Sequence, residues 1–103
     1  MTTTAMNLNS LAQAMRVFQT MKPQIRASQI EMLILIAENP DISQGNLAEL
    51  CMCSKSTVSK AIDNLGDEAG LLTVRNDEQD ERRKLIALSK QGQRVLRYLE
   101  RHI

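Results

Sequence analysis

Two short apolar runs in the C-terminal half of the chain enclose a strongly charged segment. The first run, 71–75, alternates as a strand does, and the second covers 85–88. Four carboxylates and three cations lie between them. Short alternating runs separated by polar residues are typical of a β-hairpin. We expect strands at about 72–75 and 84–88 and an exposed loop at 76–83, with a basic tip that can reach a polyanion: Arg82, Arg83 and Lys84.

The segment before this hairpin indicates two short helices around a tight turn. Ser43 can cap a helix that runs to about Cys51, residues 51–53 form the turn, and Ser54 can cap the next helix. This pattern predicts a helix-turn-helix at 43–65. Its inward-facing residues are expected to be Leu47, Ala48, Leu50, Val58, Ala61, Ile62 and Leu65.

The second of these helices begins with small hydroxyls and lysines. Short or flexible side chains let a helix approach base edges in a DNA groove, whereas large rigid groups hold it away. The positive N-terminal end of the helix and the Ser54 hydroxyl can meet a phosphate. The alternative is the solvated face of a core helix. The candidate DNA-contacting residues are Ser54, Lys55, Ser56, Thr57, Ser59 and Lys60, with Arg75 and the three basic residues of the hairpin tip.

The two ends of the chain carry apolar seams at helical spacing. The first seam repeats at intervals of three and four, as in helices that pair, and Ser89 can cap the last helix. A small domain offers little else to cover the first seam. We therefore expect 8–22 and 89–103 to be dimerisation helices, through Leu8, Leu11, Met15, Phe18, Val95, Leu96 and Leu99.

A further helix is predicted between these regions. Residues 28–31, Ser-Gln-Ile-Glu, fit a capping box, and Asn39-Pro40-Asp41 ends the helix. Its apolar face is expected to comprise Ile30, Leu33, Ile34 and Ala37.

The bulk composition narrows the possible functions. At 103 residues the chain is one domain, 1–103, and its single Tyr and Phe cannot build a stacking platform for single strands. The formal charge is +1, but residues 1–53 hold three basic and four acidic side chains, and residues 54–103 hold ten and eight. With no signal peptide or membrane-spanning run in the sequence, we expect a cytoplasmic protein.

No arrangement of catalytic residues is visible, and no cofactor or metal is expected. Cys51 and Cys53 lack the further ligands that a zinc site needs. Lys55 and the helix start favour a thiolate at Cys53, which is one route to redox sensing. Cys51 stands where an apolar core residue belongs, so we favour a structural role for both.

The acidic residues of the hairpin loop need a physical explanation, because they repel phosphates. One solution is that Asp80 turns inward and pairs with an arginine, which stiffens the loop. Arg82 then projects freely, as suits the narrow minor groove.

The order of these motifs resembles the MarR family of winged-helix regulators. The resemblance covers about 26–96, and its most specific part is Asp80-Glu81-Arg82 followed by Leu88-Ser89 and Gly92. The spacing from Leu65 to Gly70 is one residue longer than the family's pattern.

The resemblance implies a mainly α fold with a β-hairpin wing at 72–88 and a recognition helix that starts at Ser54. It also implies a homodimer on a pseudo-palindromic operator in double-stranded DNA, with Arg82 in the minor groove and Asp80 shaping the wing. Because the terminal helices are short, a small-molecule effector is not favoured. Two rivals stay open: a plasmid or phage protein for replication, partition or excision, and a protein–protein adaptor without DNA binding.

Overall fold

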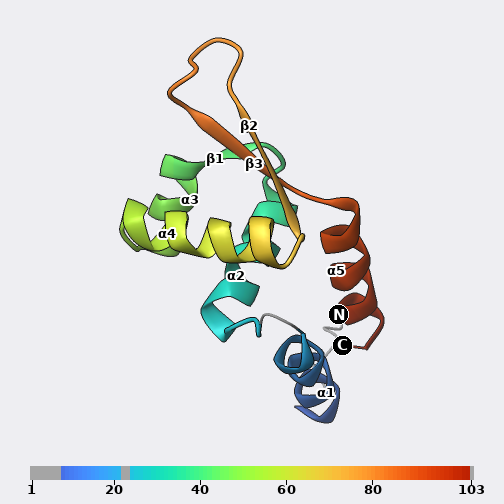
Figure 1. Ribbon diagram of the computed structural model, residues 1–103. Coiled ribbons are helices and arrows are strands. Elements are labelled where there is room, and N and C mark those ends of the chain that lie inside the picture. The colour runs from blue at the N-terminus through green and yellow to red at the C-terminus, as the bar shows by residue number, and fades with distance from the viewer. Residues whose placement is uncertain (1–7, 22–23, 103) are drawn as a thin grey trace, which may run out of the picture.

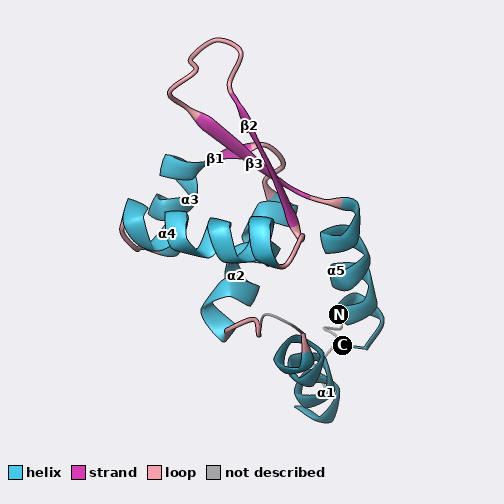
Figure 2. Cartoon of the chain, in the orientation of Figure 1, coloured by secondary structure: helices cyan, strands magenta, loops and turns pink. Residues whose placement is uncertain are grey.

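The computed structural model describes residues 8–21 and 24–102, and it is mainly helical with a small antiparallel sheet (Figure 1; Figure 2). The wing projects from one end of the molecule, and α1 lies at the other (Figure 1). The elements in order are α1 (Leu8–Thr20), α2 (Ala27–Glu38), β1 (Ile42–Ser43), α3 (Gln44–Cys51), α4 (Lys55–Ile62), the π-helical segment η1 (Asp63–Glu68), β2 (Leu72–Asn76), β3 (Lys84–Leu88) and α5 (Lys90–His102).

Helix α2 is the centre of the hydrophobic core, and its buried face differs from the predicted one. Ile30 and Leu33 are buried as expected, but Ile34 is 45% exposed and Ala37 is exposed. Met32 and Ile36 are buried instead. The helix packs against α3, β3 and α5, so its contacts extend around more than one side. A single apolar stripe in the sequence therefore does not predict which residues of α2 are buried, because the helix packs on more than one side.

The start of α2 also differs from the prediction. The helix begins at Ala27, and Arg26 is its N-cap residue, so Ser28 lies inside the first turn. The Gln29 side-chain oxygen accepts a hydrogen bond of 3.0 Å from the Arg26 backbone N–H. Gln29 thus takes the position that we expected for Glu31, and the cap at Ser28 is wrong.

The helix-turn-helix forms largely as predicted. Ser43 and Ser54 cap α3 and α4, each accepting a backbone N–H bond of 3.1 Å. Met52 in the turn takes a left-handed conformation with φ 56°. All the predicted inward residues are buried except Leu50, which is 50% exposed, so the prediction for Leu50 is wrong.

The sheet contains a strand that the sequence did not indicate. β2 and β3 pair from Leu72 with Leu88 to Asn76 with Lys84, close to the predicted hairpin. On the other side of β3, the two-residue β1 pairs Ile42 with Ile86. The strand order β1-β3-β2 ties the helix-turn-helix to strand β3 of the wing.

The segment between α4 and the wing forms a π-helical turn. In η1, the Ala69 N–H bonds to the Asn64 carbonyl five residues earlier, at 2.9 Å. A π turn holds one residue more than an α turn. The helical segment thus continues past the expected end at Leu65, to Glu68. Gly70, at φ +71°, then turns the chain into β2.

Candidate nucleic-acid interface

The first turn of α4 is held by a cluster of hydroxyls. The Ser54 Oγ, besides its capping bond, lies 2.9 Å from Thr57 Oγ1 and 3.2 Å from Ser56 Oγ. These contacts keep the start of the helix rigid. The hydroxyls of Ser54 and Thr57, which we expected to contact DNA, are therefore engaged with each other.

The exposed face of α4 carries small polar side chains between two lysines. Val58, Ala61 and Ile62 are buried, which directs Ser56 and Ser59 away from the core. Lys55 and Lys60 are five residues apart, so at about 100° per residue they lie about 140° apart around the helix. The two ammonium groups thus lie on opposite flanks of the exposed serines.

Lys55 lines an open groove of about 630 Å³ between α3, α4 and the wing. Four cations line this groove against one carboxylate, that of Asp80. Lys55, Arg83 and Lys84 have no ion-pair partner within residues 8–21 and 24–102. The full lining is Ser43, Gln44, Gly45, Asn46, Lys55, Asp80, Arg82, Arg83 and Lys84.

The wing loop contains the expected pair of Asp80 with an arginine, and that arginine is Arg82. The Asp80 carboxylate accepts bonds from both the backbone N–H of Arg82, at 3.1 Å, and its guanidinium Nε, at 3.3 Å. Arg82 is therefore the paired arginine rather than a free one, although its side chain is 93% exposed. The Arg83 N–H adds a 2.9 Å bond to the Asp80 carbonyl. These bonds hold the basic tip in one shape.

Arg75 does not join the other basic residues. Its guanidinium lies 3.4 Å from the Asp41 carboxylate, beside β1. It does not line the groove at the wing. The ion pair with Asp41 links Arg75, near the loop end of β2, to the segment just before β1, on the other side of β3.

Lys60 lines a second groove, of about 540 Å³, on the other flank of α4. Arg26 lies in this groove as well, and sequence reasoning missed it. The only sequence signal was a basic residue before a helix, 34 positions from Lys60. The full lining is Gln24, Arg26, Ser28, Gln29, Met32, Thr57, Lys60, Ala61 and Asn64.

The predicted dimerisation residues divide between core and surface. Phe18, Leu96 and Leu99 are buried inside this chain, because α1 packs against α5. Leu8 is 80% exposed, and Leu11, Met15 and Val95 are half-buried. The expectation that a small domain offers little to cover the first seam is therefore wrong for Phe18.

Cys51 ends α3 and Cys53 lies in the turn before α4, and both thiols are half-buried. Burial raises the pKa of the Cys51 thiol, and the neighbouring Cys53 and Glu31 raise it further. A raised pKa disfavours the reactive thiolate. Among the described residues, no group of three or more His, Cys, Asp or Glu is placed to hold a metal ion.

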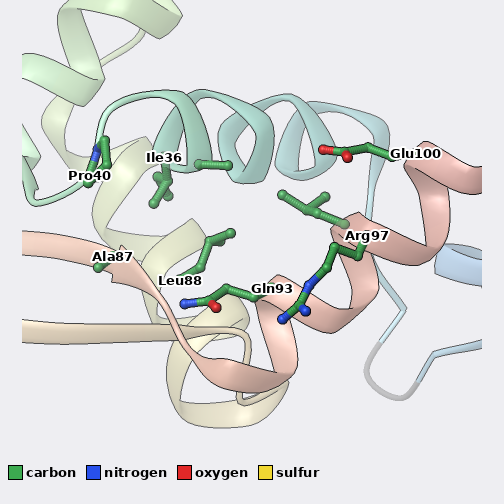
Figure 3. Close-up of a pocket in the computed structure, with 9 residues that line it drawn as sticks. Ile36, Pro40, Ala87, Leu88, Gln93, Arg97 and Glu100 are labelled. Carbon is green, nitrogen blue, oxygen red and sulfur yellow. The ribbon is translucent and has the colours of Figure 1, made fainter.

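A third hollow, of about 330 Å³, lies between the end of α2, β3 and α5 (Figure 3). Ile36 and Leu88 point into it, while Gln93, Arg97 and Glu100 are exposed side chains of α5 at its rim (Figure 3). A specific small-molecule site needs polar groups that converge on the ligand from fixed positions. The polar groups of this rim are exposed, so the hollow does not meet that requirement.

No helix within the described part of the chain is long and apolar enough to cross a membrane.

The arrangement of these elements is shared with solved structures. The structure of S. aureus MepR with DNA matches with a TM-score of 0.77 and 23% identity, over 92% of this chain and 73% of that one. S. pneumoniae FabT with DNA gives 0.76 and 22%, over 91% and 66%. The transcriptional regulator PcaV from Streptomyces coelicolor, with its natural ligand, gives 0.70 and 26%, over 97% and 77%.

Sequence comparison identifies the family directly. No curated protein sequence matches the chain. The family model described as "MarR family" matches residues 25–84, which is more than half of the 103 residues and includes the helix-turn-helix and most of the wing. The chain therefore belongs to the MarR family, and its fold is the winged helix-turn-helix.

Proposed function

We propose that this MarR-family chain regulates transcription by binding double-stranded DNA, with α4 as the recognition helix in the major groove. The observation that carries the proposal is the position of Lys55 opposite Arg83 and Lys84 across one groove, with no ion-pair partner for any of them among the described residues. Three exposed cations facing one open groove suit a phosphate backbone. Ser56 and Ser59 project beside them and are short enough to reach base edges.

The family and the solved neighbours support this proposal. MepR and FabT were each solved with DNA, and their folds match this chain. In this chain, the wing tip carries Arg82 on a loop stiffened by Asp80. An arginine on a fixed loop suits the strongly negative minor groove next to the site of a recognition helix.

We propose further that the DNA-bound form is a homodimer. Leu8, at the start of α1, is 80% exposed. A hollow of about 320 Å³ lies between the end of α1 and α5, lined by Val17, Thr20, Arg94, Val95 and Tyr98. A second copy at this end leaves both wings free. Two-fold symmetry then requires a pseudo-palindromic operator with half-sites about 34–36 Å apart, or a multiple of that distance.

Selection of bound fragments from genomic DNA, followed by a salt titration of the best duplex, tests the function. We expect fluorescence anisotropy to give a dissociation constant that rises steeply with salt, because cations of the protein release counterions from phosphates. An adaptor that uses this surface for another protein would select no fragment and show no binding for salt to weaken. That result would overturn the proposal.

A further inference from the structure

The groove on the far flank of α4 has a charge that nothing within the described chain balances. Arg26 and Lys60 both line it, both are exposed, and neither has an ion-pair partner among the described residues. No carboxylate belongs to its lining, in contrast to the groove at the wing, which includes Asp80. The remaining polar residues of the lining are neutral amides and hydroxyls, all able to donate a hydrogen bond.

The two walls of this groove are fixed to each other. The Gln29 side-chain oxygen accepts the Arg26 backbone N–H at 3.0 Å and the Asn64 side-chain amide at 3.2 Å. One amide thus joins the start of α2 to η1, which directly follows α4. Arg26 and Lys60 are therefore presented from a shared, pre-formed frame rather than from two independent elements.

The size of the DNA major groove explains why a recognition helix needs cations on both flanks. A helix with its side chains is about 10–12 Å across, and the groove is about 12 Å wide, so a phosphate backbone lies along each side of an inserted helix. Lys55 and the wing tip meet one of these backbones. The other backbone faces the opposite flank of α4, where Lys60 lies.

We infer that the groove between α2 and α4 is a phosphodiester subsite, in which Arg26 and Lys60 together hold the second backbone of the major groove. The inference rests on the proposed function, because it assumes that α4 enters DNA. It assigns Arg26 a positioning role: its contact fixes how α4 lies in the groove but does not read any base.

Operator duplexes with a neutral methylphosphonate at one backbone position at a time test this subsite. For the wild-type dimer, we expect affinity losses at two groups of positions, one on each strand bordering the major groove of a half-site. With Arg26→Ala, one group should become insensitive while the other still weakens binding, and the salt slope should fall by about one unit per monomer. With Lys55→Ala, the insensitive group should be the other one.

Two further variants make the result specific. Arg26→Lys keeps the charge and should restore the lost sensitivity. Arg97→Ala removes an exposed arginine that lines neither basic groove and should leave both groups of losses intact. If the wild type binds duplex DNA but Arg26→Ala keeps both groups and the full salt slope, the subsite is overturned and the proposed function stands. If the wild type binds no duplex, both are overturned.

Discussion

Asp80 holds Arg82 by two hydrogen bonds, one to the backbone N–H and one to the guanidinium, at 3.1 and 3.3 Å. The acidic side chain therefore shapes the wing loop, the segment that we propose to contact DNA. Its effect on binding has two opposing parts, because its charge repels phosphate while its bonds order the loop. Asp80→Ala and Glu81→Ala separate these parts.

For Asp80→Ala, we expect weaker binding to duplex DNA, although a negative charge has been removed. Without Asp80 the loop samples more conformations, and ordering it again on DNA costs free energy. Glu81→Ala is the matched control, since Glu81 is an exposed carboxylate in the same loop. Its side chain makes no hydrogen bond or ion pair with the described residues. That control should bind slightly more tightly. Tighter binding by Asp80→Ala in the same anisotropy assay would contradict a structural role for Asp80.

The serines of α4 should affect which bases are preferred rather than overall affinity. Ser56→Ala and Ser59→Ala remove donors that face away from the core, and each should change discrimination by about 1–3 kcal/mol at one base pair. Lys55→Ala should instead weaken all sequences alike and lower the salt slope. Competition among a set of single-base operator variants distinguishes the two patterns. An unchanged preference order in both serine variants would place the base contacts elsewhere.

Dimerisation through the α1 end predicts a specific effect for Leu8→Asp. Leu8 is 80% exposed in the single chain, so an aspartate there should leave the fold intact but place a charge in the dimer interface. Sedimentation at micromolar concentration should give twice the chain mass for the wild type and the chain mass for the variant. Leu50→Asp, at a 50% exposed position on α3, is the control and should remain dimeric. A monomeric wild type would rule out the dimer.

The junction of the wing with α5 predicts a strong effect at Gly92. A Cβ at this position would overlap the Leu71 carbonyl oxygen, which also accepts the Ser89 N–H at 2.9 Å. Gly92→Ala should lower the free energy of unfolding by about 1–3 kcal/mol, as overpacking does. Gly45→Ala meets nothing closer than 4.0 Å and lies within α3, so it should be neutral or slightly stabilising. Denaturant midpoints at one fixed protein concentration compare the two, and equal stability would contradict the close packing.

The environment of Cys51 predicts slow thiol chemistry near neutral pH. Since burial raises its pKa, the thiolate fraction at pH 8 should be smaller than that of a free thiol, and alkylation should accelerate only as pH rises beyond the usual cysteine range. Iodoacetamide labelling followed by mass spectrometry measures the rate.

Cys53→Ser should not change DNA affinity before or after mild peroxide. A peroxide-sensitive wild type beside an insensitive variant would show that Cys53 is a redox sensor.

The sequence by itself determined the features that depend on neighbouring residues. Ser43 and Ser54 cap their helices because the bond needs only a hydroxyl and an N–H three residues on. The hairpin likewise followed from two apolar runs and a charged loop, and the buried face of α4 followed from helical spacing. Family resemblance then assigned these local elements their order and their expected role.

Only the tertiary structure decided the features that join distant segments. β1 has two residues, too few for any periodic signal, and it exists because β3 offers a free edge. The buried side of α2 depends on which elements surround it, and the pairing of Arg75 with Asp41 depends on β1 reaching the wing. Arg26 and Lys60 line one groove for the same reason: packing brings their segments to the same place, and no local pattern in the chain records that proximity.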